Sequence, residues 1–390
     1  MTLWQLFNLL ILLFVFKSSW SQRKIIGGHL VGSVQKRYVV YIVKSDKSKM
    51  AYDNWSCGGA LVNSNHIITA AACLEDIRFL YAVAGYSIMV KTISSDPCTK
   101  WFSKKILQTC TPRAYEFNYA KVHKWAGMDI GIACTGSPFA IKNGYCSYSP
   151  EPIPINFNPK YGAEGIDAIV LGWGHFTFWR EPINKDRGLK KDLYYAPVSI
   201  MNKEKCMEYY KDFPEFQEVI RKYMICTFGK GNLDITGRLI TTIRPKYERC
   251  GKTEDGECRE NLESQLNVET PNTTEFETTR RQGICQNDHG GPLVTWIGGK
   301  EYLIGIASVF RVNKTTCVGP FLFTSTHCNG AFLHCFFNKR RSGEDPSVCD
   351  VYANEQGFEM IYRNISWNEH PDGYADNERN IPNNDFTSFY

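Results

Sequence analysis

Residues 285–294 read CQNDHGGPLV, and residues 57–73 read CGGALVNSNHIITAAAC. Both segments combine a cysteine, a pair of glycines and a short apolar run. Apolar runs of four to eight residues between turn-forming residues predict buried β-strands. Comparable runs occur at 38–43, 60–70, 80–84, 166–171, 292–297 and 302–310. The sequence therefore predicts an all-β body.

Four segments depart from this strand pattern. Helical patterns are expected only at 203–224 and at about 325–339. Residues 227–284 are polar and poor in strand signals, so they predict a long insertion that is either functional or disordered. Residues 341–390 hold ten Asp or Glu and three Arg, a net charge of −7, which is typical of a flexible acidic arm. Their aromatic residues are candidate anchors for a partner or for the domain itself.

Composition excludes several classes of protein. The chain has 390 residues, of which 43% are hydrophobic and 22% charged, so it is not disordered as a whole. Its formal net charge of +5 is too weak to indicate a nucleic-acid partner. The 15 cysteines favour an oxidising compartment.

The N-terminus predicts export. Residues 3–16 are almost wholly apolar and are followed by KSSWS, which indicates a signal peptide over 1–21 with cleavage after Ser21. An uncleaved anchor is the alternative, although 14 residues are short for a membrane span. No later run approaches ~20 apolar residues, so we expect a secreted, extracellular protein without a span in its mature form. Candidate glycosylation sites are Asn54, Asn272, Asn313 and Asn364.

Seven short motifs follow one another along the chain: KIIGG at 24–28, the block 57–73, DIGIA at 129–133, GWG at 172–174, MIC at 224–226, the block 285–294 and GIASVF at 305–310. In this order and at these intervals they closely resemble the trypsin/chymotrypsin-like serine proteases over residues 25–339. The resemblance implies two packed six-stranded antiparallel barrels, a cleft between them and a closing C-terminal helix. It divides the chain into a signal peptide (1–21), a propeptide (22–24), the protease-like domain with its insertion (25–339, 227–284) and a flexible acidic tail (340–390).

The resemblance also locates the catalytic positions. The family needs a Ser nucleophile, a His that takes its proton and an Asp that orients the His. The His position is Ala72 and the Ser position is His289, so only the acid, Asp129, remains. Alanine accepts no proton, and an imidazole in the nucleophile's place has no second base. Hydrolysis by this mechanism is expected to be absent.

Neighbouring positions depart from the family as well. Asn287 stands where a Gly amide helps to build the oxyanion hole. Gly283 holds the position at which trypsin-like enzymes carry an Asp that selects Arg or Lys, and Phe310 replaces a Gly that lines the same pocket.

Two halves of the family's activation switch are kept. Cleavage after Lys24 would free the amine of Ile25, which in active members pairs with the acid at the position of Asp288. The alternative is that Asp288 only caps a turn.

The cysteines predict a covalent framework. The resemblance implies the bridges Cys57–Cys73, Cys206–Cys226 and Cys285–Cys317, and no further bridge at Ala168, where many relatives carry a Cys. Proximity in sequence suggests Cys98–Cys110, Cys134–Cys146 and Cys250–Cys258. These pairs leave Cys328, Cys335 and Cys349, and Cys349 is our candidate for an intermolecular disulfide.

The resemblance and its departures predict a secreted, non-catalytic serine protease homologue of insect type that acts in an extracellular protease, immune or reproductive-fluid pathway. It would act as a decoy, a cofactor or an adaptor, and its partner would be an extracellular protein such as an active protease or its substrate. No cofactor is expected, and no metal, because neither HxxxH nor CxxC spacing surrounds His289. Two alternatives remain: an active extracellular endopeptidase with atypical catalytic residues, and a protease inhibitor.

Overall fold

The computed structural model describes residues 28–32, 35–46, 56–75, 78–85, 98–118, 121–139, 146, 149–173, 192–240, 251–252, 258–259, 283–285, 288–313, 316–337 and 359–371. The expected signal peptide and propeptide lie outside these residues. So do Lys24, Ile25, Asn54, Asn272 and Asn287, together with Cys349 and most of the insertion.

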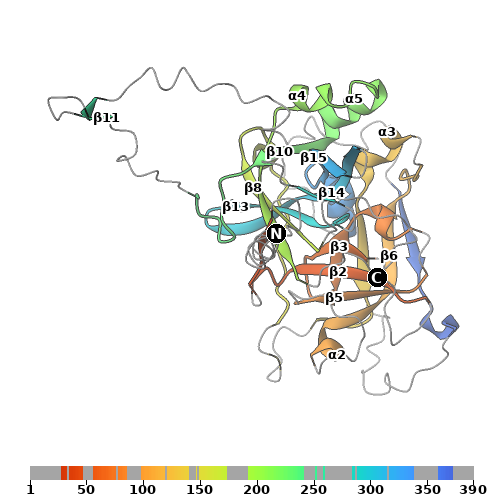
Figure 1. Ribbon diagram of the computed structural model, residues 1–390. Helices are drawn as coiled ribbons and strands as arrows, with labels where there is room; N and C mark the ends of the chain where they lie inside the picture. Colours follow the sequence, from red (N-terminus) through yellow and green to blue (C-terminus); the bar gives the residue numbers. More distant parts are fainter. Residues whose placement is uncertain are drawn as a thin grey trace, which may run out of the picture.

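Two closed antiparallel barrels form the body of the protein (Figure 1). The first barrel contains β2 (Val39–Lys44), β3 (Ser56–Leu61), β4 (His66–Thr69), β5 (Leu80–Ala84), β6 (Ser103–Pro112) and β7 (Gly131–Thr135), and the pairing of β6 with β7 closes it. The second contains β8 (Asp167–Gly172), β9 (Tyr194–Ile200), β10 (Met224–Lys230), β13 (Pro292–Ile297), β14 (Lys300–Asn313) and β15 (Thr316–Ser325), and β8 and β9 close it. The predicted pair of six-stranded barrels is confirmed.

The strands form because their side chains are apolar on both faces. In β2 five of the six residues are buried, and all five residues of β5 and of β7 are buried. Such strands lie between a barrel interior and the layer that covers it, so strict alternation with polar residues is lost. The six predicted strand segments fall on β2, β3 with β4, β5, β8, β13 and β14.

The helices are shorter than predicted. The segment 203–224 contains two helices, α4 (Lys203–Glu208) and α5 (Pro214–Tyr223), because Pro214 favours the start of a helix and cannot lie inside one. Within 325–339 only α7 (Gly330–Phe336) is an α-helix. The other helices of the described residues are α2 (Thr99–Phe102), α3 (Val122–Trp125) and the 3-10 turns η1 (Ala71–Cys73), η2 (Ala126–Met128), η3 (Pro159–Gly162) and η6 (Trp367–Glu369). In the described part of the chain, no helix has the length and apolar character needed to cross a membrane.

The insertion begins later than predicted. Residues 227–230 belong to β10, which pairs with both β9 and β15. Further along, β11 (Gly251–Lys252) and β12 (Cys258–Arg259) pair with each other as a two-stranded sheet.

Each barrel receives one extra strand from a distant part of the chain. Near the N-terminus β1 (His29–Leu30) pairs with β9 of the second barrel. In the acidic tail β16 (Met360–Asn364) pairs with β6 of the first barrel over five residues. The prediction of a flexible arm is therefore wrong for residues 359–371.

Trp367 anchors this part of the tail. Its side chain is 5% exposed, and its indole Nε1–H donates to the carbonyl of Ile106 at 3.0 Å. The ring packs 4.8 Å from that of Tyr81 and 5.2 Å from that of Phe79, and the ammonium of Lys105 lies 4.7 Å from its centroid. Aromatic packing by the acidic tail thus binds the tail to its own domain.

We predict that Trp367→Ala releases β16 from β6. Replacing a buried Trp by Ala typically costs about 3–5 kcal/mol, more than a five-residue edge strand is expected to withstand. Hydrogen exchange should show faster exchange of the amides of 360–364, with the second barrel unaffected. Trp101→Ala is the control, because Trp101 is 43% exposed, and it should leave the tail protected. Unchanged protection in Trp367→Ala would contradict this anchoring role.

Three predicted disulfides are confirmed and two are wrong. Cys57–Cys73, Cys206–Cys226 and Cys285–Cys317 are bridged. Cys98 pairs with Cys146 rather than with Cys110. Strand β6 carries Cys110 seven residues beyond its first residue, Ser103, or roughly 23 Å at 3.3 Å per residue, and disulfide geometry needs Cα atoms within about 7 Å.

Pairing the cysteines by proximity in sequence also predicted the wrong free thiols. Cys110 and Cys134 are unbridged and buried in the first barrel, whereas Cys335 on α7 is unbridged and exposed. Cys328 is also disulfide-bonded. The Cys250–Cys258 bridge and the proposed role of Cys349 stay predictions.

We predict that iodoacetamide labels Cys335 in the native protein and spares Cys110 and Cys134. Burial raises the pKa of Cys110 and of Cys134 to about 12, so both are thiols rather than reactive thiolates near neutral pH. Peptide mapping after a short pulse should find the label at Cys335, and at all three positions only after denaturation. Equal labelling of the three in folded protein would show that the first barrel is open.

Candidate active site

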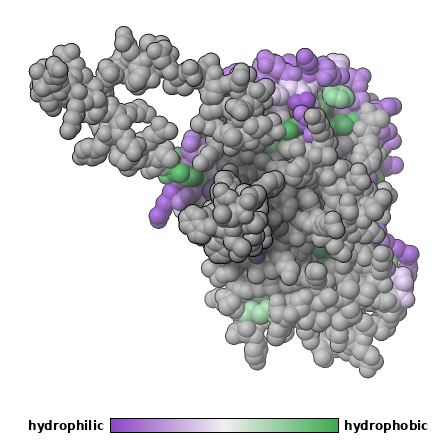
Figure 2. Space-filling view, in the orientation of Figure 1, coloured by the Kyte–Doolittle hydropathy of each residue, from purple (hydrophilic) through white to green (hydrophobic). Residues whose placement is uncertain are grey.

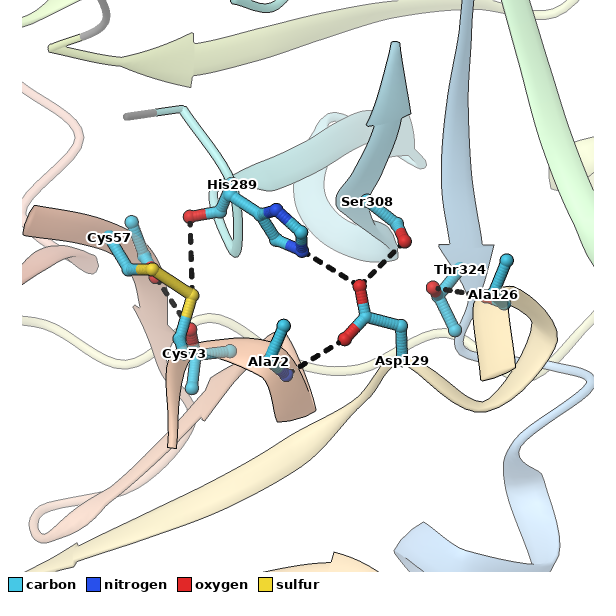
Figure 3. A network of polar contacts seen from close by, with 10 residues as sticks. Cys57, Ala72, Cys73, Ala126, Asp129, His289, Ser308 and Thr324 are labelled. Carbon is cyan, nitrogen blue, oxygen red and sulfur yellow. Dashed lines mark hydrogen bonds and ion pairs between the residues drawn. A yellow bond between two sulfur atoms is a disulfide. The ribbon is translucent and has the colours of Figure 1, made fainter. Parts of the chain in front are cut away.

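The buried carboxylate of Asp129 is the centre of the inter-barrel site (Figure 3). Its exposed fraction is 0%, and it accepts three hydrogen bonds. The backbone N–H of Ala72 donates to Oδ1 at 3.0 Å, the imidazole Nε2–H of His289 to Oδ2 at 2.7 Å, and the hydroxyl of Ser308 to Oδ2 at 2.6 Å. These donors replace the water that the charge has lost.

Elements of both barrels bring these groups together. Asp129 follows η2 and immediately precedes the segment that enters β7, and Ala72 lies in η1 just after β4, so both belong to the first barrel. Ser308 lies in β14, and His289 precedes the turn that leads into β13, so both belong to the second. The structure places Ala72 and His289 within hydrogen-bond reach of Asp129, and the catalytic meaning of the three positions stays a prediction.

Glycines allow the barrels to approach at this point. The N–H of Gly58 in β3 donates to the carbonyl of His289 at 2.7 Å. A Cβ on Gly58 would lie 2.6 Å from the Cα of Gly291, which no real side chain tolerates. Gly290 has a φ of +79°, a conformation that glycine adopts without strain. The GG pairs of segments 57–73 and 285–294 therefore allow the two barrels to contact each other closely.

The arrangement lacks a nucleophile bonded to a base. His289 binds Asp129 through Nε2, and its other ring nitrogen points away from the carboxylate in Figure 3. Ser308 donates its hydroxyl to Asp129 rather than to an imidazole, and it is only 4% exposed. Ala72 contributes a backbone N–H and no side-chain function. Among the described residues, no three His, Cys, Asp or Glu side chains gather where they could hold a metal ion.

The specificity position is filled by a residue that the sequence reasoning missed. Gly283 is buried, and a Cβ added there would lie 2.0 Å from the ring of Phe321. Phe321 in β15 is 1% exposed and belongs to the core of the second barrel, against which Phe310 packs from the side. A carboxylate side chain at 283 has no room. The available signal was the Gly319-Pro320-Phe321 sequence, two residues after Cys317.

The described half of the activation switch is a buried carboxylate. Asp288 has an exposed fraction of 0%, and its Oδ2 accepts the N–H of Cys285 at 3.0 Å. A Cβ on Gly172 would lie 2.1 Å from Oδ1 of Asp288, so the GWG motif is needed for this close approach. Whether Ile25 reaches Asp288 stays a prediction, as does the role of Asn287.

Two of the four candidate glycan acceptors are described. Asn313 is exposed at the last position of β14, and Asn364 is exposed at the end of β16. The side chain of Asn364 accepts a hydrogen bond from Gln108 at 2.8 Å. Their glycosylation stays a prediction.

Comparison with known proteins agrees with this geometry. The family model described as Trypsin matches residues 25–236, more than half of the chain. The chain belongs to the trypsin family. It is 27% identical to the venom peptide isomerase heavy chain of Agelenopsis aperta over 53% of this chain and 76% of that protein. It is 28% identical to phenoloxidase-activating enzyme 1 of Spodoptera litura over 47% of this chain and 46% of the relative.

Other relatives extend the comparison. The clotting factor G beta subunit of Tachypleus tridentatus is 23% identical over 54% of this chain and 62% of its own length. The chain thus spans about half to three quarters of the curated relatives it matches. A solved structure, the scabies mite inactivated protease paralogue S-D1, has a TM-score of 0.48 and 16% identity, and the match covers 81% of this chain and 99% of that one.

We predict that His289→Ala destabilises the protein by about 1–3 kcal/mol, because the buried Asp129 carboxylate loses a hydrogen bond and part of its compensation. His123→Ala is a matched control. Its side chain is 27% exposed against 24% for His289, but its partner, Glu215, lies at the surface. The control should change the free energy of unfolding by no more than about 0.5 kcal/mol. Urea denaturation measures both, and equal effects would mean that His289 does not support Asp129.

Proposed function

We propose that this trypsin-family protein is a secreted, non-catalytic homologue that acts by binding other proteins. The observation that carries the proposal is the hydrogen bond between the imidazole of His289 and the carboxylate of Asp129. The imidazole is committed to the buried Asp129 through Nε2, and no hydroxyl or thiol of the described residues is bonded to its ring. An acyl-transfer mechanism needs that nucleophile, and loss of triad members costs about 10⁴–10⁶ in rate.

The filled specificity position supports the same proposal. A trypsin-like enzyme holds the substrate side chain in a pocket beside the position of Gly283. Phe321 occupies that space with an exposed fraction of 1%. Binding energy from such a pocket is one source of rate enhancement, and a pocket filled at this position cannot supply it.

The relatives support an extracellular setting. Their names include a phenoloxidase-activating enzyme and a clotting factor subunit. We infer that the partner is an extracellular protein of a proteolytic cascade, either an active protease or its substrate. A decoy, a cofactor and an adaptor are three forms of this role.

The competing function is catalysis without a nucleophilic triad. The isomerase heavy chain among the relatives makes proton transfer the relevant alternative, since His289 and Asp129 form an imidazole–carboxylate pair. An oriented imidazole can act as a general base if a substrate proton lies within hydrogen-bond reach. The two functions differ in whether His289 is required for turnover.

We predict that the processed protein neither hydrolyses peptides nor reacts with a fluorophosphonate probe. An enteropeptidase site placed directly before Ile25 gives a defined new N-terminus, so that lack of cleavage cannot explain lack of activity. A trypsin-family zymogen treated in the same way is the positive control.

A broad peptide library, analysed by mass spectrometry for cleavage and by chiral chromatography for epimerisation, covers both alternatives. Turnover that persists through repurification and disappears in His289→Ala would overturn the proposal.

To test the binding role, the protein is added to an active protease of the same fluid. A cofactor raises the rate at which the protease cleaves its protein substrate. A decoy lowers that rate because it binds the protein substrate tightly itself. An inhibitor lowers the cleavage of small peptide substrates as well.

A further inference from the structure

A cavity of about 250 Å³ lies on the second barrel, away from the Asp129 site. It is bounded by η3, the start of α4, the end of α5 and the turn that follows β15. Its base includes Met224, Ile225 and Ile304, which are 0%, 4% and 2% exposed. The cavity therefore has an apolar base under a rim that contains polar and charged side chains.

The ammonium group of Lys203 belongs to that rim and has no acidic partner. It donates to the backbone carbonyl of Arg221 at 2.8 Å, and no carboxylate in the described part of the chain pairs with it. Lys36 shows the usual solution for a buried ammonium group, since it pairs with Glu301 and lies over the ring of Trp296. Burial lowers the pKa of Lys203, which means that its charged form bears a desolvation cost that a bound anion would offset.

Two further cations line the cavity beside Lys203. Arg221 and Lys222 both pair with the carboxylate of Glu218. Glu204 acts on Arg221 from a distance, and Glu164 accepts a hydrogen bond from Asn202, the residue before Lys203. Hydrophilic side chains cover much of α4 and α5 in Figure 2.

A second donor at the cavity has an unused proton. Ser325 is 5% exposed, and its Oγ accepts the N–H of Cys328 at 3.3 Å. The hydroxyl hydrogen has no acceptor among the described residues. Next to it, His327 donates its Nδ1–H to the carbonyl of Phe157, which leaves Nε2 as its remaining polar atom.

We propose that this cavity is a binding site for a small amphipathic anion whose acidic head lies against Lys203 and Ser325 and whose apolar body lies on Ile225 and Ile304. A carboxylate, sulfonate or phosphate ester can supply the head. Apolar cavities of ~150 Å³ accept benzene, so 250 Å³ accommodates one ring with a short acidic chain. This site does not depend on the proposed protein-binding function.

The probe is 4-phenylbutyrate, measured with the full-length protein by isothermal titration calorimetry and by thermal denaturation. Two matched compounds separate the contributions: 4-phenylbutanol keeps the body without the charge, and acetate keeps the head without the body. We expect phenylbutyrate to bind and to raise Tm, the alcohol to bind at least tenfold more weakly, and acetate not to bind measurably.

Three variants test whether the ligand binds in this cavity. Lys203→Met keeps most of the stem but removes the charge, and should weaken binding at least tenfold. Lys205→Met removes an exposed lysine of the same helix and should leave the affinity unchanged. Gly162→Leu fills the cavity, because a Cβ on Gly162 would lie 3.3 Å from Cδ1 of Ile225, and should abolish binding without altering any charge.

Lys203→Met also has an expected effect on Tm in the absence of ligand. If the lysine is an uncompensated cation, its removal should maintain or raise Tm, whereas a purely structural lysine would lower it. The proposal is overturned if phenylbutyrate and related organic carboxylates and sulfonates fail to bind at 10 mM, if Lys203→Met or Gly162→Leu binds as well as wild type, or if inorganic phosphate binds as tightly as phenylbutyrate.

Discussion

The charge of Asp129 is the constraint on which the meeting of the two barrels depends. A carboxylate with no exposed surface is costly unless each oxygen accepts hydrogen bonds. The first barrel supplies one donor, the N–H of Ala72, and the second supplies two, the side chains of Ser308 and His289. The charge is satisfied only while the barrels are packed together, so it couples their relative position to the stability of the domain.

This constraint gives the two departures at the catalytic positions a common explanation. With Ala72 at the position of the family's histidine, the first barrel gives Asp129 a backbone N–H and no imidazole. His289 enters from the opposite barrel and supplies an imidazole to the same carboxylate. The electrostatic requirement of the fold is met, while the hydroxyl that an acyl-transfer mechanism needs is absent from position 289. Under the proposed function, stability and chemistry, which share these positions in an active member of the family, are separated in this protein.

The sequence predicts those features that are local or repeated throughout the family. Apolar runs such as 38–43 and 80–84 define strands directly, and the motif blocks place Ala72, Asp129 and His289 in one site. The contacts that it did not predict join distant segments. Trp367 binds a strand more than 250 residues away, and Cys98 pairs with Cys146 because β6 carries Cys110 out of reach. The sequence offered the tail aromatics as anchors for a partner or for the domain, but composition does not show which surface they cover, so the tail was predicted to be flexible.

Phe321 bears on which form of binding this geometry favours. A decoy that imitates an enzyme must hold a substrate in the cleft, and in this family much of that affinity comes from the side-chain pocket. With Phe321 packed against Gly283, a basic substrate side chain has no room at that position. A partner held by the cleft would then rely on backbone contacts with strands such as β14, which cost more in ordering than a preformed pocket. Within the proposed function, we therefore prefer a cofactor or adaptor that uses its outer surfaces. One such surface is the first barrel around β16, where Ile361 and Tyr362 are 43% and 49% exposed. That surface exists only because the tail is attached, so the segment whose composition predicted a flexible arm would contribute to what a partner contacts.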